Sequence, residues 1–161
     1  MNVALIIPAR NEETPLPGVL AEIPPGVVER VIVVDNGSTD RTAEVSGNAG
    51  AVVVSEPRAG YGFACAAGVQ AARQREADVL VFIDADGSFD PAQIRDLLAP
   101  IESGQADLVL GSRLAGGIEP GAMPPHAQFG NWLVARLMRT LYNLPVTDLG
   151  PFRAIRADLL D

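Results

Sequence analysis

The sequence predicts an α/β protein with a mostly parallel central sheet and helices on both faces of that sheet. Short apolar runs alternate with helix-like segments along the first 112 residues, which is typical of consecutive β-α-β units. The runs are apolar at nearly every position rather than at every second one, which indicates strands that are covered on both faces. Polar clusters follow four of the runs, and ligands gather at the carboxyl ends of strands in such sheets.

The elements follow from the apolar runs and from the residues that bound them. We expect strands at 3–8, 28–35, 51–56, 78–85 and 107–112. We expect helices at 15–23, 41–48, 61–75 and 91–103, with Thr39 or Asp40 capping the second and Pro91 opening the fourth. A loop rich in Gly and Pro is expected at 115–126, followed by an amphipathic helix at 127–144.

Composition excludes several classes of function. All 12 basic residues are Arg, so Schiff-base chemistry and the lysine of a P-loop are excluded. Residues 1–112 hold 7 Arg against 16 Asp and Glu, and this acidic body argues against a nucleic-acid partner. A single cysteine, Cys65, cannot form an internal disulfide, and no apolar run approaches the roughly 20 residues of a membrane span. We therefore expect a cytoplasmic domain.

Three carboxylates stand at the end of the fourth predicted strand, in the stretch VFIDADGSFDP. An EF-hand is excluded, because counting from Asp84 puts Phe89 where the loop needs Gly and Arg95 where it needs Glu. Asp90 is best interpreted as the cap of the helix that Pro91 opens. Asp84 and Asp86, one residue apart at a strand end, can both reach one hard cation, for which Mg²⁺ or Mn²⁺ is the expected metal.

Four motifs in order complete the pattern: VALIIPARNEE, VIVVDNGSTDRT, VLVFIDADGSFDP and DLVLGSR. Together they resemble the family 2 inverting glycosyltransferases with the GT-A nucleotide-sugar fold. The likeness is closer to the polyprenyl-phosphate sugar synthases of the dolichyl-phosphate mannose synthase type, and it covers about residues 3–156. The later stretch TDLGPFRA also resembles a motif of this type.

The resemblance implies roles for particular positions. It implies nucleotide binding by Pro8, Ala9, Arg10, Glu12, Asp35, Gly37, Ser38, Asp84 and Ala85. It implies metal binding by Asp84 and Asp86, phosphate contact by Arg113, and contact with acceptor and sugar by Asp148 and Arg153. Ser88 is a departure, because this type often has Gln at that position as a further metal ligand.

The expected function is metal-dependent, inverting transfer of a sugar from a UDP- or GDP-sugar to a polyprenyl phosphate. A lipid phosphate is already anionic and needs no strong base, whereas a hydroxyl acceptor would need one, for which Asp148 is the candidate. Two alternatives stay open: a sugar-phosphate nucleotidyltransferase, which would want lysine and a glycine-rich first loop, and a non-catalytic module that binds nucleotide sugars.

We expect one catalytic domain over 1–161, with a nucleotide-binding half at 1–112 and an acceptor-side segment at 113–161 that lacks a further C-terminal part. Residues 126–156 contain four Arg and a single acidic residue, Asp148. That segment is either a peripheral contact with an anionic membrane or an ordinary helix that covers the sheet. The glycines of Pro57–Gly62 either admit a phosphate or form a tight turn, and His126 is either a surface residue or an acceptor contact.

Overall fold

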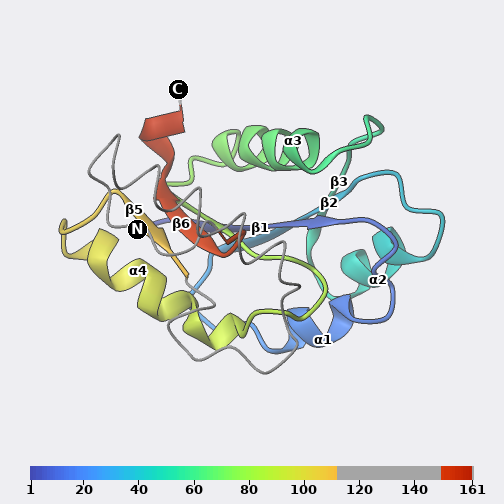
Figure 1. The fold of residues 1–161 in the computed structure, drawn as a ribbon, viewed down its shortest axis with the longest axis horizontal. Coiled ribbons are helices and arrows are strands. Elements are labelled where there is room, and N and C mark those ends of the chain that lie inside the picture. Colours follow the sequence, from blue (N-terminus) through green and yellow to red (C-terminus); the bar gives the residue numbers. More distant parts are fainter. Residues whose placement is uncertain (112–149, 161) are drawn as a thin grey trace, which may run out of the picture.

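The computed structural model describes residues 1–111 and 150–160, which form a six-stranded sheet with helices on both faces (Figure 1). The strand order is β3-β2-β1-β4-β6-β5. The strands are β1 (Val3–Ala9), β2 (Arg30–Asp35), β3 (Val52–Ser55), β4 (Val79–Phe82), β5 (Leu108–Leu110) and β6 (Arg153–Arg156). The first four are parallel, and β6 lies antiparallel between β4 and β5.

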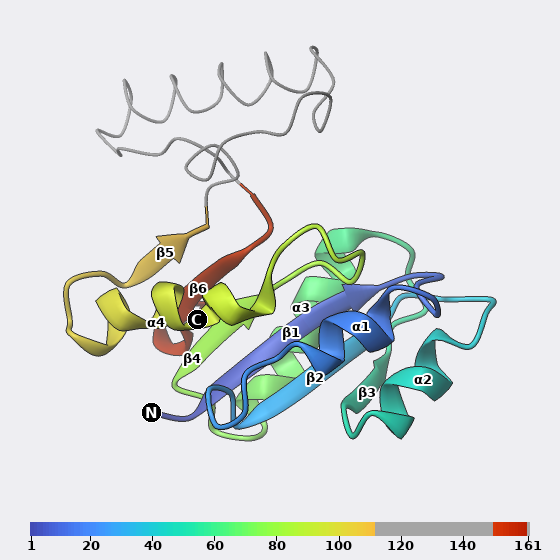
Figure 2. The same ribbon diagram turned by 90° about the horizontal axis from the view of Figure 1, so that it is seen from below.

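Four α-helices cover the sheet unequally (Figures 1 and 2). They are α1 (Leu16–Ala21), α2 (Thr42–Asn48), α3 (Tyr61–Arg73) and α4 (Ile94–Glu102), and α4 follows a 3₁₀ turn, η1 (Pro91–Gln93). A second 3₁₀ turn, η2 (Ala157–Leu160), follows β6. Helix α3 lies on one side of the sheet, and α1, α2 and α4 lie on the other. The predicted mostly parallel α/β fold is confirmed.

The strands are apolar throughout because alternate residues enter two separate cores. Leu5 and Ile7 of β1 pack with α1 and α4, whereas Ala4 and Ile6 pack with α3. Parallel strands buried on both faces need this uninterrupted pattern. Leu5, Ile6 and Ile7 are all fully buried. The sheet is therefore held rigidly between two layers, and its strand ends are fixed points on which a site can be built.

The structure departs from the expected elements at three places. Strand β6 is an addition to the expected strands, and it separates β5 from β4. The fourth expected helix divides into η1 and α4, and Asp90 does cap it, accepting a hydrogen bond from the backbone N–H of Ala92 at 2.8 Å. Of the two expected caps of α2, Thr39 is wrong, because its hydroxyl donates to Asn11, whereas the Asp40 carboxylate accepts from the N–H of Thr42, the first residue of α2, at 3.0 Å.

The segment of residues 112–149 contains the expected loop at 115–126, the expected helix at 127–144, and the candidate residues Arg113 and Asp148, and it lies outside the described residues. The described ends of the chain on either side of it are neighbours: the Gly111 N–H donates to the Phe152 carbonyl at 2.8 Å, and Leu110 pairs with Arg153. Among residues 1–111 and 150–160, no helix is long and apolar enough to cross a bilayer.

Candidate functional site

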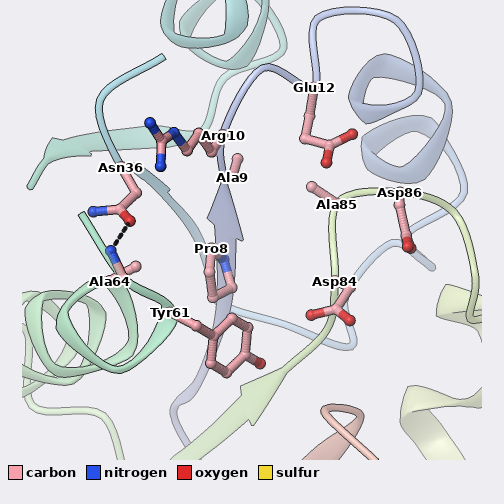
Figure 3. Close-up of a pocket in the computed structure, with 11 residues that line it drawn as sticks. Pro8, Ala9, Arg10, Glu12, Asn36, Tyr61, Ala64, Asp84, Ala85 and Asp86 are labelled. Carbon is pink, nitrogen blue, oxygen red and sulfur yellow. Dashed lines mark hydrogen bonds between the residues drawn. The ribbon is translucent and has the colours of Figure 1, made fainter. Parts of the chain in front are cut away.

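A pocket of about 330 Å³ lies at the carboxyl ends of β1, β2 and β4, beside the start of α3 (Figure 3). This is the edge of the sheet at which the sequence predicts polar clusters. The pocket is lined by Pro8, Ala9, Arg10, Glu12, Asn36, Gly60, Tyr61, Ala64, Asp84, Ala85 and Asp86.

Three carboxylates, Glu12, Asp84 and Asp86, make one side of the pocket acidic (Figure 3). The pKa of Glu12 is raised by partial burial and by the negative charges of Asp86, Asp40 and Asp84. This mutual repulsion has a cost in the absence of a counter-charge, and a cation placed among the carboxylates would relieve it.

The donor set fits a hard divalent cation that shares its coordination with a ligand. Asp84 and Asp86 supply carboxylate oxygens, which Mg²⁺ and Mn²⁺ prefer. The backbone N–H of Ser88 donates to Asp86 Oδ1 at 2.9 Å, and Gly87 takes a positive φ of 76° where the chain turns between them. Within the described part of the chain, no three acidic, His or Cys side chains form a metal cluster. The remaining ligands of such an ion would be water and phosphate oxygens.

The turn after β1 is fastened to the loop after β2. Asn11 has a left-handed φ of 58°, a conformation that asparagine tolerates better than most residues. Its backbone N–H donates to Ser38 Oγ at 3.0 Å, and its side-chain oxygen accepts from the Thr39 N–H at 2.8 Å. The Glu12 N–H donates to the Thr42 hydroxyl at 2.8 Å. These bonds hold the Glu12 side chain at the pocket.

Asn36 fastens the loop between β3 and α3 in the same way. Its buried side-chain amide donates to the carbonyl oxygens of Glu56 at 2.9 Å and Arg58 at 2.7 Å. Its oxygen accepts from the Gly60 N–H at 2.8 Å. The buried Glu56 carboxylate in turn pairs with the Arg58 guanidinium at 2.7 Å. The first residues of α3 are thereby fixed against the pocket.

Tyr61, the first residue of α3, is the aromatic side chain among the pocket's lining residues. Tyr61 is half exposed, and its ring lies below Pro8 and Asp84 in the view of Figure 3. Partial burial raises the pKa of Tyr61, so the phenol stays protonated. Cys65 lies one turn along the helix, and burial also raises the pKa of its thiol. Asp84 and Arg153 both act electrostatically on this pair.

The predicted site residues fall into three groups. Those that line the pocket are Pro8, Ala9, Arg10, Glu12, Asp84, Ala85 and Asp86. Asp35, the last residue of β2, lies beside the pocket without lining it, as do Gly37 and Ser38 of the β2–α2 loop. The Asp35 carboxylate accepts from the Ser38 N–H at 3.0 Å. Arg153 opens β6 next to β4. Arg113 and Asp148 lie outside the described residues.

Asn36, Gly60, Tyr61 and Ala64 line the pocket, although sequence reasoning did not assign them to the nucleotide site. The glycine-rich stretch at 57–62 was a signal for two of them. In the sequence, a hairpin turn at Asn36-Gly37 is disfavoured by the predicted helix cap that follows it, and no pattern assigns Asn36 to the site. The structure shows no hairpin there, because β2 and β3 are parallel, and the Asn36 side chain is buried.

This geometry, with acidic strand ends at one edge of a parallel sheet, agrees with a comparison of the whole sequence. The sequence profile of Glycosyl transferase family 2 matches residues 4–161. The chain belongs to this family.

Several family 2 relatives resemble most of the chain. An uncharacterised glycosyltransferase of Mycobacterium tuberculosis (strain ATCC 25618 / H37Rv) is 44% identical over 159 residues, which cover 98% of this chain and 69% of the relative. The undecaprenyl-phosphate mannosyltransferase of Micrococcus luteus is 36% identical over 168 residues, which cover 99% of this chain and 68% of that protein.

Solved structures show the same fold. Glucosyl-3-phosphoglycerate synthase from M. tuberculosis, crystallised with Mn²⁺, UDP and glucosyl-3-phosphoglycerate, superimposes with a TM-score of 0.74 at 28% identity. The match covers 99% of this chain and 58% of the synthase, so the chain spans little more than half of that enzyme. The predicted resemblance to GT-A family 2 glycosyltransferases is confirmed.

Proposed function

We propose that this chain carries the donor site of a metal-dependent, inverting glycosyltransferase that moves a sugar from a UDP- or GDP-sugar to a polyprenyl phosphate. The observation that carries the proposal is the pocket at the strand ends, where Glu12, Asp84 and Asp86 lie together beside the start of α3. Family membership supports sugar transfer, and the complexes of the synthase with Mn²⁺ or Mg²⁺ and UDP support the metal and the nucleotide.

In this proposal Asp84 and Asp86 hold a Mg²⁺ or Mn²⁺ ion, which supplies positive charge for the leaving diphosphate. The rest of the work falls to the chain itself. The turn at residues 8–12 and the loop at 35–38 bind the nucleoside, and Arg113 and Arg153 face phosphate groups. Because the turn at residues 8–12 is hydrogen-bonded to the loop after β2, the groups of these two segments are oriented before the donor arrives.

The proposed acceptor is a lipid phosphate, which is what the name of the Micrococcus relative specifies for that protein. A phosphate oxygen is anionic at neutral pH and attacks the sugar carbon without first losing a proton. A hydroxyl acceptor such as phosphoglycerate, which the synthase structures contain, would require a base, and Asp148 is the residue proposed for that role.

A binding and transfer assay tests both levels of the proposal. Thermal unfolding is measured with UDP, GDP, UDP-glucose and GDP-mannose, each with and without Mn²⁺, because a ligand of the folded state raises the midpoint. The protein is then incubated with the donor that stabilises it, with Mn²⁺, and with either undecaprenyl phosphate in detergent or 3-phosphoglycerate. The products are identified by mass spectrometry.

We expect either the uridine or the guanosine ligands to raise the unfolding midpoint in the presence of Mn²⁺. We expect a hexosyl prenyl phosphate as the product of transfer. Hexosyl phosphoglycerate would overturn the lipid acceptor and keep the glycosyltransferase. A protein that binds a nucleotide sugar with metal but forms neither product nor free nucleoside diphosphate would be a binding module. The absence of any nucleotide-dependent shift would overturn the donor site.

A further inference from the structure

Arg153 enters the sheet directly opposite Phe82, the last residue of β4. Directly opposed residues on antiparallel strands point to the same face of a sheet. Ile155, two residues further along β6, packs against the same core cluster as Phe82, which puts both side chains on the α3 face. The Arg153 guanidinium carbon lies 4.9 Å from the centroid of the Phe82 ring, within the range of a cation–π contact.

Arg153 also reaches the residues that bound the pocket. Cys65 of α3 packs against the same core cluster as Phe82 and lies one turn beyond Tyr61, which lines the pocket, and the charge of Arg153 acts on both side chains. Asp84 follows Phe82 by two residues and acts electrostatically on the same tyrosine and cysteine. The cation and one of the two proposed metal-binding aspartates therefore share neighbours at the end of β4.

We propose that Phe82 is a positioning residue of the donor site: its ring holds the Arg153 guanidinium beside Tyr61, where the cation faces the diphosphate of the nucleotide sugar. This inference rests on the proposed function. Phe82 is 3% exposed and does not line the pocket, so it acts through Arg153.

An aromatic ring has an advantage over a carboxylate as the residue that holds an arginine side chain in place. A carboxylate that fixes an arginine also cancels its charge, as Glu56 does for Arg58. An aromatic face attracts the guanidinium while leaving its positive charge available to a second, anionic partner. A long side chain that is already held loses less conformational freedom when phosphate binds, so the preorganised cation binds more tightly.

The test compares variants of Phe82 that lack or keep a ring. Phe82→Leu removes the ring and keeps an apolar side chain, whereas Phe82→Tyr keeps the ring. Phe63→Leu is the matched control, because the Arg58 guanidinium carbon lies 4.6 Å from the Phe63 ring centroid in the same kind of contact and Phe63 does not line the pocket. Calorimetry with Mn²⁺ and whichever of UDP or GDP stabilises the wild type gives the Kd, and circular dichroism confirms that each variant is folded.

We expect Phe82→Leu to raise the Kd about tenfold and Phe82→Tyr and Phe63→Leu to leave it within about twofold. Arg153→Gln should weaken binding at least as much, and adding Phe82→Leu to it should change the Kd no further, because the two residues act as one unit. NMR of arginine-labelled protein reads the contact itself: the ring should shift the Arg153 side-chain protons upfield, and Phe82→Leu should abolish that shift.

Other outcomes distinguish failure of the role given to Phe82 from failure of the proposed function. If Arg153→Gln weakens binding and Phe82→Leu does not, Phe82 has no positioning role. Wild-type affinity in Arg153→Gln would mean that the cation does not face the diphosphate. If the wild type binds neither UDP nor GDP with Mn²⁺, the proposed function itself fails and the role given to Arg153 fails with it.

Discussion

At the scale of single residues, the pocket concentrates negative charge, because three of its lining residues are carboxylates. Asp90 has a structural duty, because its carboxylate caps η1. Asp84, Asp86 and Glu12 instead line a pocket in which Asp86 and Asp84 raise the pKa of Glu12. Carboxylates that repel one another at a strand end favour the binding of a cation, which supports the metal site proposed above.

Replacing Asp86 by Asn removes this charge with little change in shape. We expect Asp86→Asn to abolish the part of the thermal shift that depends on Mn²⁺, because an amide oxygen binds a hard cation far more weakly than a carboxylate does. Asp90→Asn is the matched control, since Asn is as good a helix cap as Asp and the same unit of charge is lost four residues away. A full Mn²⁺ response in Asp86→Asn would remove Asp86 from the metal site.

Asn36 gives a second prediction at this scale, and it concerns stability. Its side chain satisfies three backbone groups of the β3–α3 loop. Asn36→Asp has the same shape but cannot donate, so its carboxylate would face the carbonyl oxygens of Glu56 and Arg58. We expect a loss of about 2–4 kcal/mol in the free energy of unfolding, measured by urea denaturation. A loss under about 0.5 kcal/mol would show that the loop does not depend on this clamp.

At the scale of elements, the close approach of α3 to β1 places the start of the helix at the pocket. Gly68 makes this approach possible, because a Cβ atom there would lie 2.4 Å from Ile6 Cγ2 and 3.3 Å from Val34 Cγ2. We expect Gly68→Ala to lower the free energy of unfolding by about 1–3 kcal/mol, since both partners are fully buried in the sheet.

Gly62, in the first turn of the same helix, is the control for this prediction. A Cβ atom there would meet nothing within 4 Å, so Gly62→Ala should stabilise the protein by about 0.5–1 kcal/mol through helix propensity. Urea denaturation of the two variants side by side measures both effects. If both alanines stabilise, helix and sheet are not in the tight contact that the Gly68 geometry shows.

The loop that leads into α3 carries a prediction about pH. The hydrogen bonds from the Arg58 side chain and backbone lower the pKa of Glu56 from 4.5 to about 2. A carboxyl whose pKa is lower in the folded state stabilises the fold fully above pH 4.5 and loses this contribution as the pH falls toward 2. The wild type should therefore lose stability across this window more steeply than Glu56→Gln does.

Urea midpoints measured at intervals between pH 5 and about pH 2 test this, and Arg58→Gln should flatten the profile as Glu56→Gln does. Parallel profiles for the wild type and both variants would mean that the ion pair contributes nothing to the pH dependence of folding.

The elements that could be predicted from the sequence are those whose signal is local. The strands β1 and β4 are predictable because almost every residue in them is apolar. The start of the helical segment after β4 is predictable because its cap, Asp90, and its first residue, Pro91, are adjacent in the sequence. Strand β6 escapes prediction because Arg153–Arg156 is four residues long and begins and ends with Arg. Its place in the sheet comes from pairing with β4, which lies far earlier in the chain, and such pairing leaves no local pattern.

The same reasoning explains the site. Pro8, Glu12, Asp84 and Asp86 belong to motifs that can be recognised one strand end at a time. Tyr61 and Asn36 line the pocket only because α3 packs against β1 and because one amide bonds to a loop 20 residues further along the chain. The sequence around Tyr61 or around Asn36 does not predict these contacts, because they depend on how distant parts of the chain pack together.

At the scale of the whole molecule, the proposed donor site is assembled from four separate loops. The turn after β1 is bonded to the loop after β2 through Asn11 and Ser38, and that loop is bonded to the start of α3 through Asn36. The loop after β4 completes the pocket with Asp84 and Asp86. The division into a donor half at 1–112 and an acceptor-side segment at 113–161 stays a prediction.

This connectivity predicts how a bound donor changes the dynamics of the protein. Because the loops are bonded to one another, Mn²⁺ with the cognate nucleoside diphosphate should slow hydrogen exchange in all four together, at residues 9–13, 35–39, 57–62 and 84–88. Mn²⁺ alone should protect chiefly the last of these, which holds the two aspartates. Hydrogen exchange measured by mass spectrometry would show the pattern. Peptides from α4, which contributes no residue to the pocket lining, serve as internal references for the exchange rate. Protection confined to a single loop would mean that the hydrogen bonds between the loops do not make them one binding unit.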